Sequence, residues 1–521
     1  MLQSPQNSSN RARVMFYSLA VCLLGASLAA GYYLPTSVTD LIGLTNSSDL
    51  STSTACGCGH KEESELPPCC AARLAAEKEA APTISEFTLT DADRKDQLEA
   101  PTLAVDSLGR VFVAWASQTG EKERTLFLAS SLTGGKSFDP PKLVQKSEIY
   151  SFQTESKGRT ITRAIRMVPH LVAAGENLAV GWLAAANENT TVKMMLAESN
   201  DGGLSFGTPI CIHQSDKARP TFTSLSANAQ GRIAASWLDH RAEAQLPFFA
   251  IRAATGEAFG EELKIPAGEE NKGICPCCPT ASVVASDGTV YVAYRNLLAG
   301  HRDMFVAKWT EKGLETPVAV VEPTWQFDGC PHDGPSLALG GETLHIVWMD
   351  GHTGTQRVYH GQASTADLKF TTRAIHAAGP GTQGNAKLAT TESGLVAVWE
   401  ESLEEVAAEE QKSEESTAKK GHAHGPTGSG RAIMFAYAPA GGEFGPATAV
   451  LKRAGRFQTR PAVVGSSEGK FVVAFNELDE QGKRVVIVRQ PLQPPVTETP
   501  TATPVGEALP ADEPEKTGAD S

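Results

Sequence analysis

The sequence predicts an all-β protein, a β-propeller of four-stranded blades with seven blades favoured over six. Three observations predict this fold class. A short apolar segment, in most copies opening at a proline, recurs at intervals of 51 to 68 residues, and once after 75. In each copy a second apolar segment ends at an aromatic residue, and two further strand-like segments follow, the last of them weak. Gly and Pro, at 47 and 31 residues, are spread along the chain as many short strands and turns require. Four-strand repeats of this kind are typical of propeller blades.

Seven copies define the elements of the predicted ring. Their first strands open at Pro101, Pro169, Pro220, Pro279, Pro335, Ala386 and Pro461. Their second strands are expected to end at Trp115, Trp182, Trp237, Tyr294, Trp348, Trp399 and Phe475. The last copy stops one strand short, after residues 484–489, so we expect Ser85–Thr90 to supply the missing strand and close the ring. Closure removes two open sheet edges, which would otherwise invite aggregation.

The chain divides into four parts. Residues 1–34 form a signal peptide or signal anchor, because Arg11 and Arg13 precede an uncharged apolar run. Residues 35–83 form a Ser/Thr- and Ala-rich stalk that contains cysteine, and residues 84–490 form the propeller, interrupted by a low-complexity insertion at 402–430. The Pro/Thr/Glu-rich tail at 491–521 is disordered by composition. We therefore expect an exported protein, periplasmic or extracellular, attached to the membrane through its N-terminal segment if that segment is not cleaved.

The net charge of −14 is concentrated in two segments outside the repeats. Residues 400–416 carry eight acidic residues and one Lys, and residues 491–521 carry six acidic residues and one Lys. The remainder is close to neutral and has no basic stripe. This distribution argues against a nucleic-acid partner.

A motif at the turn between third and fourth strands carries a family resemblance. Ser199, Asp201, Gly203 and Phe206 fit the pattern Ser-x-Asp-x-Gly-x-x-aromatic at every defined position. Residues 131–138 fit it with Thr133 in place of Asp, and residues 252–259 and 441–444 keep only the Gly and the aromatic. We expect a tight hairpin in which Asp accepts backbone N–H bonds and the aromatic plugs the blade.

In phase with the repeat, this motif resembles the Asp-box of sialidase-like, BNR-repeat propellers over about 400 residues. The resemblance implies that the Asp-box is structural and lies away from the catalytic face. It also implies glycan recognition. Sialidases hold the substrate carboxylate with three Arg and use a Tyr nucleophile. The Phe-Arg-Ile-Pro type of motif for the first Arg is absent, and Tyr294 occupies a core position, so we expect no conventional sialidase activity.

Propeller geometry places the remaining polar residues of interest on one face. The loops that enter the first strands and those that join second to third strands open on the same rim of the channel. The ligand-binding residues predicted there are His170, Arg219, Asp239, Arg241, Arg295, Arg302, Asp303 and Arg460. No catalytic residue is assigned.

The ten cysteines include a group on this face. Cys275, Cys277 and Cys278 precede the fourth copy, and Cys330 and His332 precede the fifth. The Cys-x-Cys-Cys-Pro and Cys-Pro-x-x-Gly-Pro elements formed by these residues resemble those of uncharacterised sialidase-like bacterial proteins. A disulfide from Cys330 to Cys275 or Cys277 is the favoured interpretation for an exported protein. The alternative is a copper or zinc site formed by these four cysteines and His332.

Three functions follow from these features. The leading hypothesis is a propeller that binds a glycan or another polar small molecule on its Cys/Arg/His-rich face, with glycoside hydrolysis as its enzymatic form. The second is a periplasmic metal-binding or redox protein that uses the Cys group. The third is a scaffold that binds a partner protein.

Overall fold

The structure is a computed structural model. It describes residues 85–89, 98–120, 122–156, 159–164, 169–186, 191–241, 244–271, 273–379, 381–403, 430–480 and 482–492. All of them belong to one compact unit, residues 80–521. The predicted N-terminal segment and stalk, most of the insertion at 402–430 and nearly all of the C-terminal tail lie outside the described residues. None of the helices in the described part has the length and apolar character needed to cross a membrane.

The described residues are largely strands, arranged mainly as antiparallel meanders in which most strands pair with their neighbours in the chain. The first three sheets are β2 (Thr102–Val105), β3 (Val111–Gln118), β4 (Glu123–Ser131) and β5 (Lys142–Glu148); β8 (His170–Ala174), β9 (Asn177–Ala186), β10 (Thr191–Ser199) and β11 (Ile210–Cys211); and β12 (Pro220–Ala227), β13 (Ile233–Asp239), β14 (Leu246–Arg252) and β15 (Leu263–Lys264). One 3₁₀ turn, η2 (Glu269–Asn271), precedes the next sheet.

The later sheets repeat this pattern. They are β16 (Ala281–Val284), β17 (Val290–Arg295), β18 (Met304–Thr310), β19 (Gly313–Leu314) and β20 (Val318–Ala319); β21 (Ser336–Gly340), β22 (Thr343–Asp350), β23 (Arg357–Ser364) and β24 (Thr371–Ala374); and β25 (Gln383–Thr391), β26 (Gly394–Ser402), β27 (Arg431–Pro439) and β28 (Thr448–Ala449). The last strands are β29 (Phe457–Ser466), β30 (Lys470–Asp479) and β31 (Gly482–Pro491).

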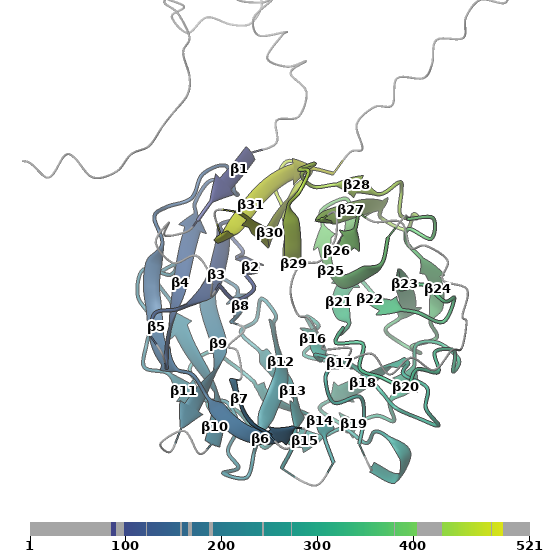
Figure 1. The fold of residues 1–521 in the computed structure, drawn as a ribbon. Helices are drawn as coiled ribbons and strands as arrows, with labels where there is room; N and C mark the ends of the chain where they lie inside the picture. The colour runs from purple at the N-terminus through teal and green to yellow at the C-terminus, as the bar shows by residue number, and fades with distance from the viewer. Residues whose placement is uncertain are drawn as a thin grey trace, which may run out of the picture. The chain divides into compact units, whose positions relative to one another are not determined.

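The missing strand of the last sheet comes from the start of the described chain. β1 (Ser85–Thr88) pairs antiparallel with β31, with Phe87 opposite Ile487. The first and last strands of the described body are therefore hydrogen-bonded neighbours, as the sequence predicts for residues 85–90 (Figure 1).

The first strands of successive sheets contact one another in chain order, and the last of them, β29, contacts β2. Figure 1 shows these strands facing the centre of the described body, with later strands of each sheet farther out. The strands that form this inner circle are β2, β8, β12, β16, β21, β25 and β29. This arrangement of four-stranded sheets around a centre is that of a β-propeller.

The aromatic residues predicted to end the second strands are all buried. Trp115 is 3% exposed and Trp237 and Trp399 are fully buried, and the clusters to which they belong combine residues of adjacent sheets. These contacts between sheets explain why the aromatic recurs with the repeat. The sequence did not predict the hairpin formed by β6 (Ser151–Ser156) and β7 (Arg159–Ala164). It accounts for the 68-residue interval between the first two openings.

The Asp-box hairpin has the bonds that its sequence predicts. The Asp201 carboxylate accepts hydrogen bonds from the backbone N–H of Leu204 and Ser205, both at 3.0 Å. These bonds and those from the Ser199 and Ser205 hydroxyls hold the pKa of Asp201 well below its usual range. The Ser199 hydroxyl accepts the N–H of Gly203 at 2.8 Å. Phe206 packs against the cluster that joins this sheet to the preceding one.

The Thr variant of the motif folds in the same way. The hydroxyl of Ser131 accepts the N–H of Gly135 at 2.8 Å, and the hydroxyl of Thr133 accepts the N–H of Ser137 at 3.0 Å. Phe138 packs between the first and last sheets. A hydroxyl therefore replaces the carboxylate with fewer backbone bonds but the same turn.

Candidate functional site

Asp239 and Arg241, both predicted to bind ligand, form an ion pair with each other that stabilises the fold. Asp239 follows the second-strand aromatic by two residues, and its carboxylate accepts the indole N–H of Trp237 at 2.7 Å. Arg241 donates to Asp239 at 2.7 Å and to Glu262 at 3.0 Å and lies 4.3 Å from the ring centroid of Phe248. Burial would raise the pKa of Asp239, but the bonds from Arg241 and Trp237 outweigh it and lower that pKa. Both terminal nitrogens of the guanidinium are thus engaged by carboxylates.

An acid in the same position, two residues after the buried aromatic, accepts hydrogen bonds elsewhere in the fold. Trp399 donates its indole N–H to Glu401 at 3.0 Å, again two residues later. In the last sheet Glu477 follows Phe475 by two residues and accepts bonds from Arg453 and Arg484 at 2.8 and 2.5 Å. An acid follows the buried aromatic by two residues in four of the seven copies, as Asp239, Asp350, Glu401 and Glu477. The sequence analysis did not recognise this pattern, which would have removed Asp239 from the predicted site.

Arg295, Arg302 and Asp303 are also buried by the fold. Arg295 is 1% exposed and donates to three backbone carbonyls, those of Asp333, Arg302 and Met349, at 3.3, 2.8 and 2.7 Å. Arg302 donates to the carbonyl of Phe327 at 2.7 Å. The carboxylate of Asp303 accepts the backbone N–H of Trp325 at 3.2 Å and so shapes the loop before β21. These residues therefore bind backbone groups of the loops at the channel rim, and the two arginines do not form a solvent-exposed cluster.

The other three predicted ligand-binding residues lie at or near the channel mouth. Arg460 is exposed, and Arg219 is partly exposed, donating to the carbonyls of Asp216 and Ala218. His170 is the first residue of β8 and hydrogen-bonds the Thr223 hydroxyl of the next first strand at 2.8 Å. Burial, and next the charge of Lys387, lower the pKa of His170 to about 4. The imidazole is therefore neutral at pH 7.

Three of the first strands share a distortion at their channel-face ends. The pairing of β12, β25 and β29 with the second strands shifts register there, which is a β-bulge in each case. The residue inside each bulge has a positive φ without being glycine: Phe222 at 48°, Asn385 at 51° and Arg460 at 55°. Such backbone is costly for residues with a Cβ and persists where the surroundings enforce it.

Two of the three bulge residues, Phe222 and Asn385, were not predicted from the sequence. Phe222 is 38% exposed, and Asn385 donates to Glu400 at 2.8 Å. The sequence did contain a signal for the bulge in β29. Pro461 lies inside this strand, and a Pro within a strand is confined to edges and bulges. Asn385 and Lys387 carry no comparable signal.

A group of buried charges lies behind the bulges. The Asp333 carboxylate accepts the N–H of Asn385 at 2.5 Å through one oxygen, and its other oxygen has no hydrogen-bond partner among the described residues. Burial raises the pKa of Asp333, against the opposing charges of Arg295 and Lys387. Burial also lowers the pKa of Lys387. Glu400 accepts the N–H of Arg460 at 2.6 Å, which links this group to the exposed rim.

The cysteines before β16 converge on one point. The sulfur of Cys275 lies 3.4 Å from that of Cys278 and 3.8 Å from that of Cys277, and all three side chains are buried. Cys330 is exposed but lies within hydrogen-bonding reach of Cys277. Hydrogen bonds from Cys277 and Cys278 lower the pKa of Cys275, and its thiolate in turn raises the pKa of each of them.

The disulfide predicted from Cys330 is not formed in this structure, in which the five described cysteines are free thiols. The sulfur separations within the group of three are well beyond the 2.03–2.05 Å of an S–S bond. His332, the other predicted metal ligand, is exposed on the loop before β21 and lies outside the group of converging thiols.

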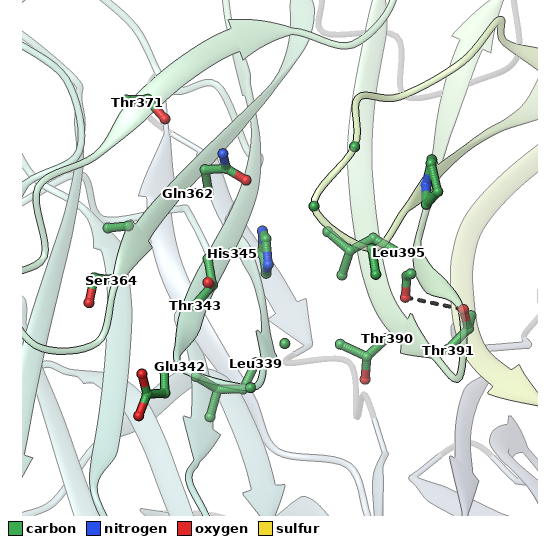
Figure 2. Close-up of a pocket in the computed structure, with 18 of the residues that line it drawn as sticks. Leu339, Glu342, Thr343, His345, Gln362, Ser364, Thr371, Thr390, Thr391 and Leu395 are labelled. Carbon is green, nitrogen blue, oxygen red and sulfur yellow. Dashed lines mark hydrogen bonds between the residues drawn. The ribbon is translucent and has the colours of Figure 1, made fainter.

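A pocket of about 740 Å³ lies elsewhere, between the sheets that begin with β21 and β25. It is formed by the turns at the far ends of these first strands, and Figure 2 shows Thr343, His345, Gln362 and Thr390 along its walls. None of the predicted ligand-binding or metal-binding residues lines it. The pocket and the channel mouth are thus at opposite ends of the same strands.

The described body is an all-β propeller with a polar channel mouth and an adjacent thiol group. No protein-family model matches the sequence, and a search of curated proteins finds no match. Among solved structures, a protein of unknown function from Dyadobacter fermentans DSM 18053 is similar at 12% identity and a TM-score of 0.42, covering 79% of this chain and 100% of that one.

Two enzymes are similar at comparable levels. A sialidase from Trypanosoma rangeli has 11% identity and a TM-score of 0.39, and the match covers 66% of this chain and 57% of the sialidase. An α-L-arabinanase from Penicillium chrysogenum, solved with arabinobiose, has 12% identity and a TM-score of 0.41, with 79% of this chain and 99% of that chain covered.

Proposed function

We propose that the chain is an exported, seven-bladed propeller that binds a glycan or another small polar ligand at the mouth of its channel. The observation that carries the proposal is the repeated bulge, which places a non-glycine residue at positive φ in three separate first strands. Three such residues cost on the order of 1–3 kcal/mol each. A cost repeated at one rim indicates that these side chains are retained for what they contact.

The chemistry of the rim suits a carbohydrate. An exposed aromatic ring, here Phe222, offers an apolar face to the C–H surface of a sugar ring. Arg460 and the amide of Asn385 supply donors and an acceptor for hydroxyl groups. The buried carboxylates of Asp333 and Glu400 hold the backbone of Asn385 and Arg460 from behind.

The proposal is tested by binding of the full chain to an array of neutral and anionic oligosaccharides. We expect selective binding that Phe222→Ala and Arg460→Ala each weaken at least tenfold. Leu204→Ala is the matched control, because Leu204 is 68% exposed but lies in the Asp-box hairpin away from the channel face. Failure of the array, or equal binding by all variants, would overturn the proposal.

Hydrolysis is tested with fluorogenic glycosides. We expect no efficient release from a sialoside, because Arg241, Arg295 and Arg302 are engaged with the fold and leave no cluster of three free Arg among them. Rapid turnover that Arg460→Ala abolishes would replace the binding function by an enzymatic one.

Export is proposed from the sequence alone, on the basis of Arg11, Arg13 and the apolar run that follows. Fusing residues 1–34 to alkaline phosphatase, which is active only outside the cytoplasm, tests it. Replacing the apolar run by polar residues should abolish the reporter's activity.

A further inference from the structure

The thiol group before β16 has the geometry of a metal site. Three sulfur ligands around one ion with metal–sulfur bonds of about 2.3 Å lie about 3.8–4.0 Å apart. The Cys275 sulfur is 3.8 Å from Cys277 and 3.4 Å from Cys278, and all three sulfurs lie within 4.8 Å of one another. Among the described residues they are the one group of metal-capable side chains that converges in this way.

The surroundings of the group favour a negatively charged complex. The guanidinium of Arg302 acts electrostatically on Cys275, and its buried Nη1 has no hydrogen-bond partner among the described residues. Arg295, fully buried, acts in the same way on Cys278. Three thiolates with one monovalent cation carry a charge of −2, which two guanidinium groups offset.

The ligand count separates the two metals that thiolates select. Structural zinc sites are almost always closed by four ligands, whereas Cu(I) is a soft ion that thiolates hold readily. The fourth cysteine, Cys330, is exposed on another loop; it reaches Cys277 but is not part of the group of three whose sulfurs all lie within 4.8 Å of one another. Cys277 and Cys278 are adjacent in sequence, a spacing unlike the paired Cys-x-x-Cys ligands of zinc ribbons.

We propose that Cys275, Cys277 and Cys278 bind one Cu(I) ion as three thiolate ligands at the channel rim. The site differs from the ligand site at Phe222 and Arg460 and shares none of its residues. Cys330, next to Cys277, is a lid or an entry ligand rather than a required one.

The test is an anaerobic Cu(I) titration of the reduced full chain in competition with bathocuproine disulfonate. Five other cysteines lie outside the described residues, so the titration uses a background in which Cys22, Cys56, Cys58, Cys69 and Cys70 are replaced by Ser. We expect one Cu(I) per chain and an X-ray absorption spectrum with about three Cu–S bonds. Cys275→Ser and Cys278→Ser should each weaken binding at least 100-fold.

Two control variants sharpen the result. Cys211→Ser removes a free thiol at the edge of another sheet and should leave Cu(I) binding unchanged. Cys330→Ser should change the affinity by less than tenfold. Ser is close to Cys in size, so each variant should fold. Circular dichroism of each variant checks that lost binding does not reflect unfolding.

Three outcomes would overturn the proposal. The first is the absence of Cu(I) binding above that of the Cys275→Ser variant. The second is stoichiometric zinc binding that requires Cys330, which would define a four-thiolate zinc site. The third is a disulfide among Cys275, Cys277, Cys278 and Cys330, found by non-reducing peptide mapping of protein isolated from its native compartment.

Discussion

Arg460 combines two unfavourable conditions in one residue. It has a positive φ of 55° and it precedes Pro461, whose ring further restricts the backbone of the residue before it. Its side chain is exposed, so packing does not explain its presence. This combination is what motivates the proposed role of Arg460 in ligand binding.

Arg460→Gly should raise the free energy of unfolding by about 1 kcal/mol, because glycine adopts positive φ without steric cost. The same change should weaken binding of any ligand that the channel mouth recognises. Chemical denaturation measures the first effect and the oligosaccharide array the second. A loss of stability would show that the Arg460 side chain supports the fold.

Arg295 shows the opposite behaviour, with its guanidinium buried and its donors satisfied by three carbonyls. At the level of sequence the two arginines look alike, since each is expected beside a loop that opens on the channel rim. The sequence could therefore place them on one face but could not tell which arginine folds inward, because that depends on which carbonyls the neighbouring loops present.

At the scale of single elements, the Asp-box hairpins tie adjacent sheets together. Gly203 has a φ of 81°, and a Cβ at this position would come within 2.6 Å of the Leu128 side chain on the preceding sheet. Gly256, at the equivalent position of the hairpin in residues 252–259, has a φ of 82° and nothing within 4 Å of such a Cβ. Comparing substitutions at the two positions therefore distinguishes the cost of a positive φ from the cost of a steric clash between sheets.

Gly256→Ala should lower the free energy of unfolding by about 1 kcal/mol through strain alone. Gly203→Ala should lower it by a further 1–3 kcal/mol, roughly the cost of overpacking a core contact. Urea denaturation of both variants measures the difference. Equal effects would mean that Leu128 moves aside without cost, and that the hairpin does not fix the spacing of the sheets.

A buried histidine pair links β22 to β23. His345 Nδ1 lies 3.1 Å from His360 Nε2, and the ring of His360 also contacts Phe444 of the next sheet. Burial, followed by the charges of His345 and Arg373, lowers the pKa of His360 to about 3. Burial lowers the pKa of His345 as well.

Because the folded state binds these protons less readily than the unfolded chain, stability is highest above the unfolded pKa of about 6.5 and falls as pH decreases. For His360 alone the loss between pH 7 and pH 5 is about 2 kcal/mol. His360→Gln should flatten this decline in a thermal-denaturation series. His240→Gln, which removes an exposed histidine, should leave it unchanged, and identical slopes for all three proteins would contradict the assignment.

At the scale of the whole molecule, the repeat predicted the ring and its closing strand because both follow from local patterns. An apolar strand, an aromatic and a turn recur in phase, and a ring with one strand missing demands a strand from elsewhere. The thiol group could also be located from sequence, since its three cysteines lie within four residues. Their bonding state could not, because a disulfide and a metal site use the same residues.

The channel mouth was predictable as a face but not as a set of contacts. Phe222 and Asn385 reach it only because their strands bulge, and a bulge depends on pairing with the second strand, which leaves little trace in a single strand's sequence. Lys387 and Asp333 come from adjacent sheets, and the packing of β25 against β21 brings their charges together.

The final prediction concerns ring closure, which depends on a strand of only four residues. In β1, Phe87 and Thr88 pair with Ile487 and Val486, and Glu86 forms an ion pair with Arg453 at 2.5 Å. Phe87 and the adjacent Leu89 pack against the cluster that joins the first sheet to the last. β1 is thus the outer strand of the last sheet, and without it β31 is an open edge with apolar neighbours.

A chain that begins at residue 90 should lose several kcal/mol of stability relative to one that begins at residue 84. The ladder bonds contribute about 0.5–1.5 kcal/mol each, and the burial of Leu89 together with the partial burial of Phe87 adds about 2 kcal/mol. The shorter chain should also aggregate, because an unpaired strand edge templates pairing with other chains. Hydrogen exchange should accelerate selectively at the amides of β31, while those of β17, on another sheet, keep their protection. Uniform protection in both chains would mean that the ring closes without β1.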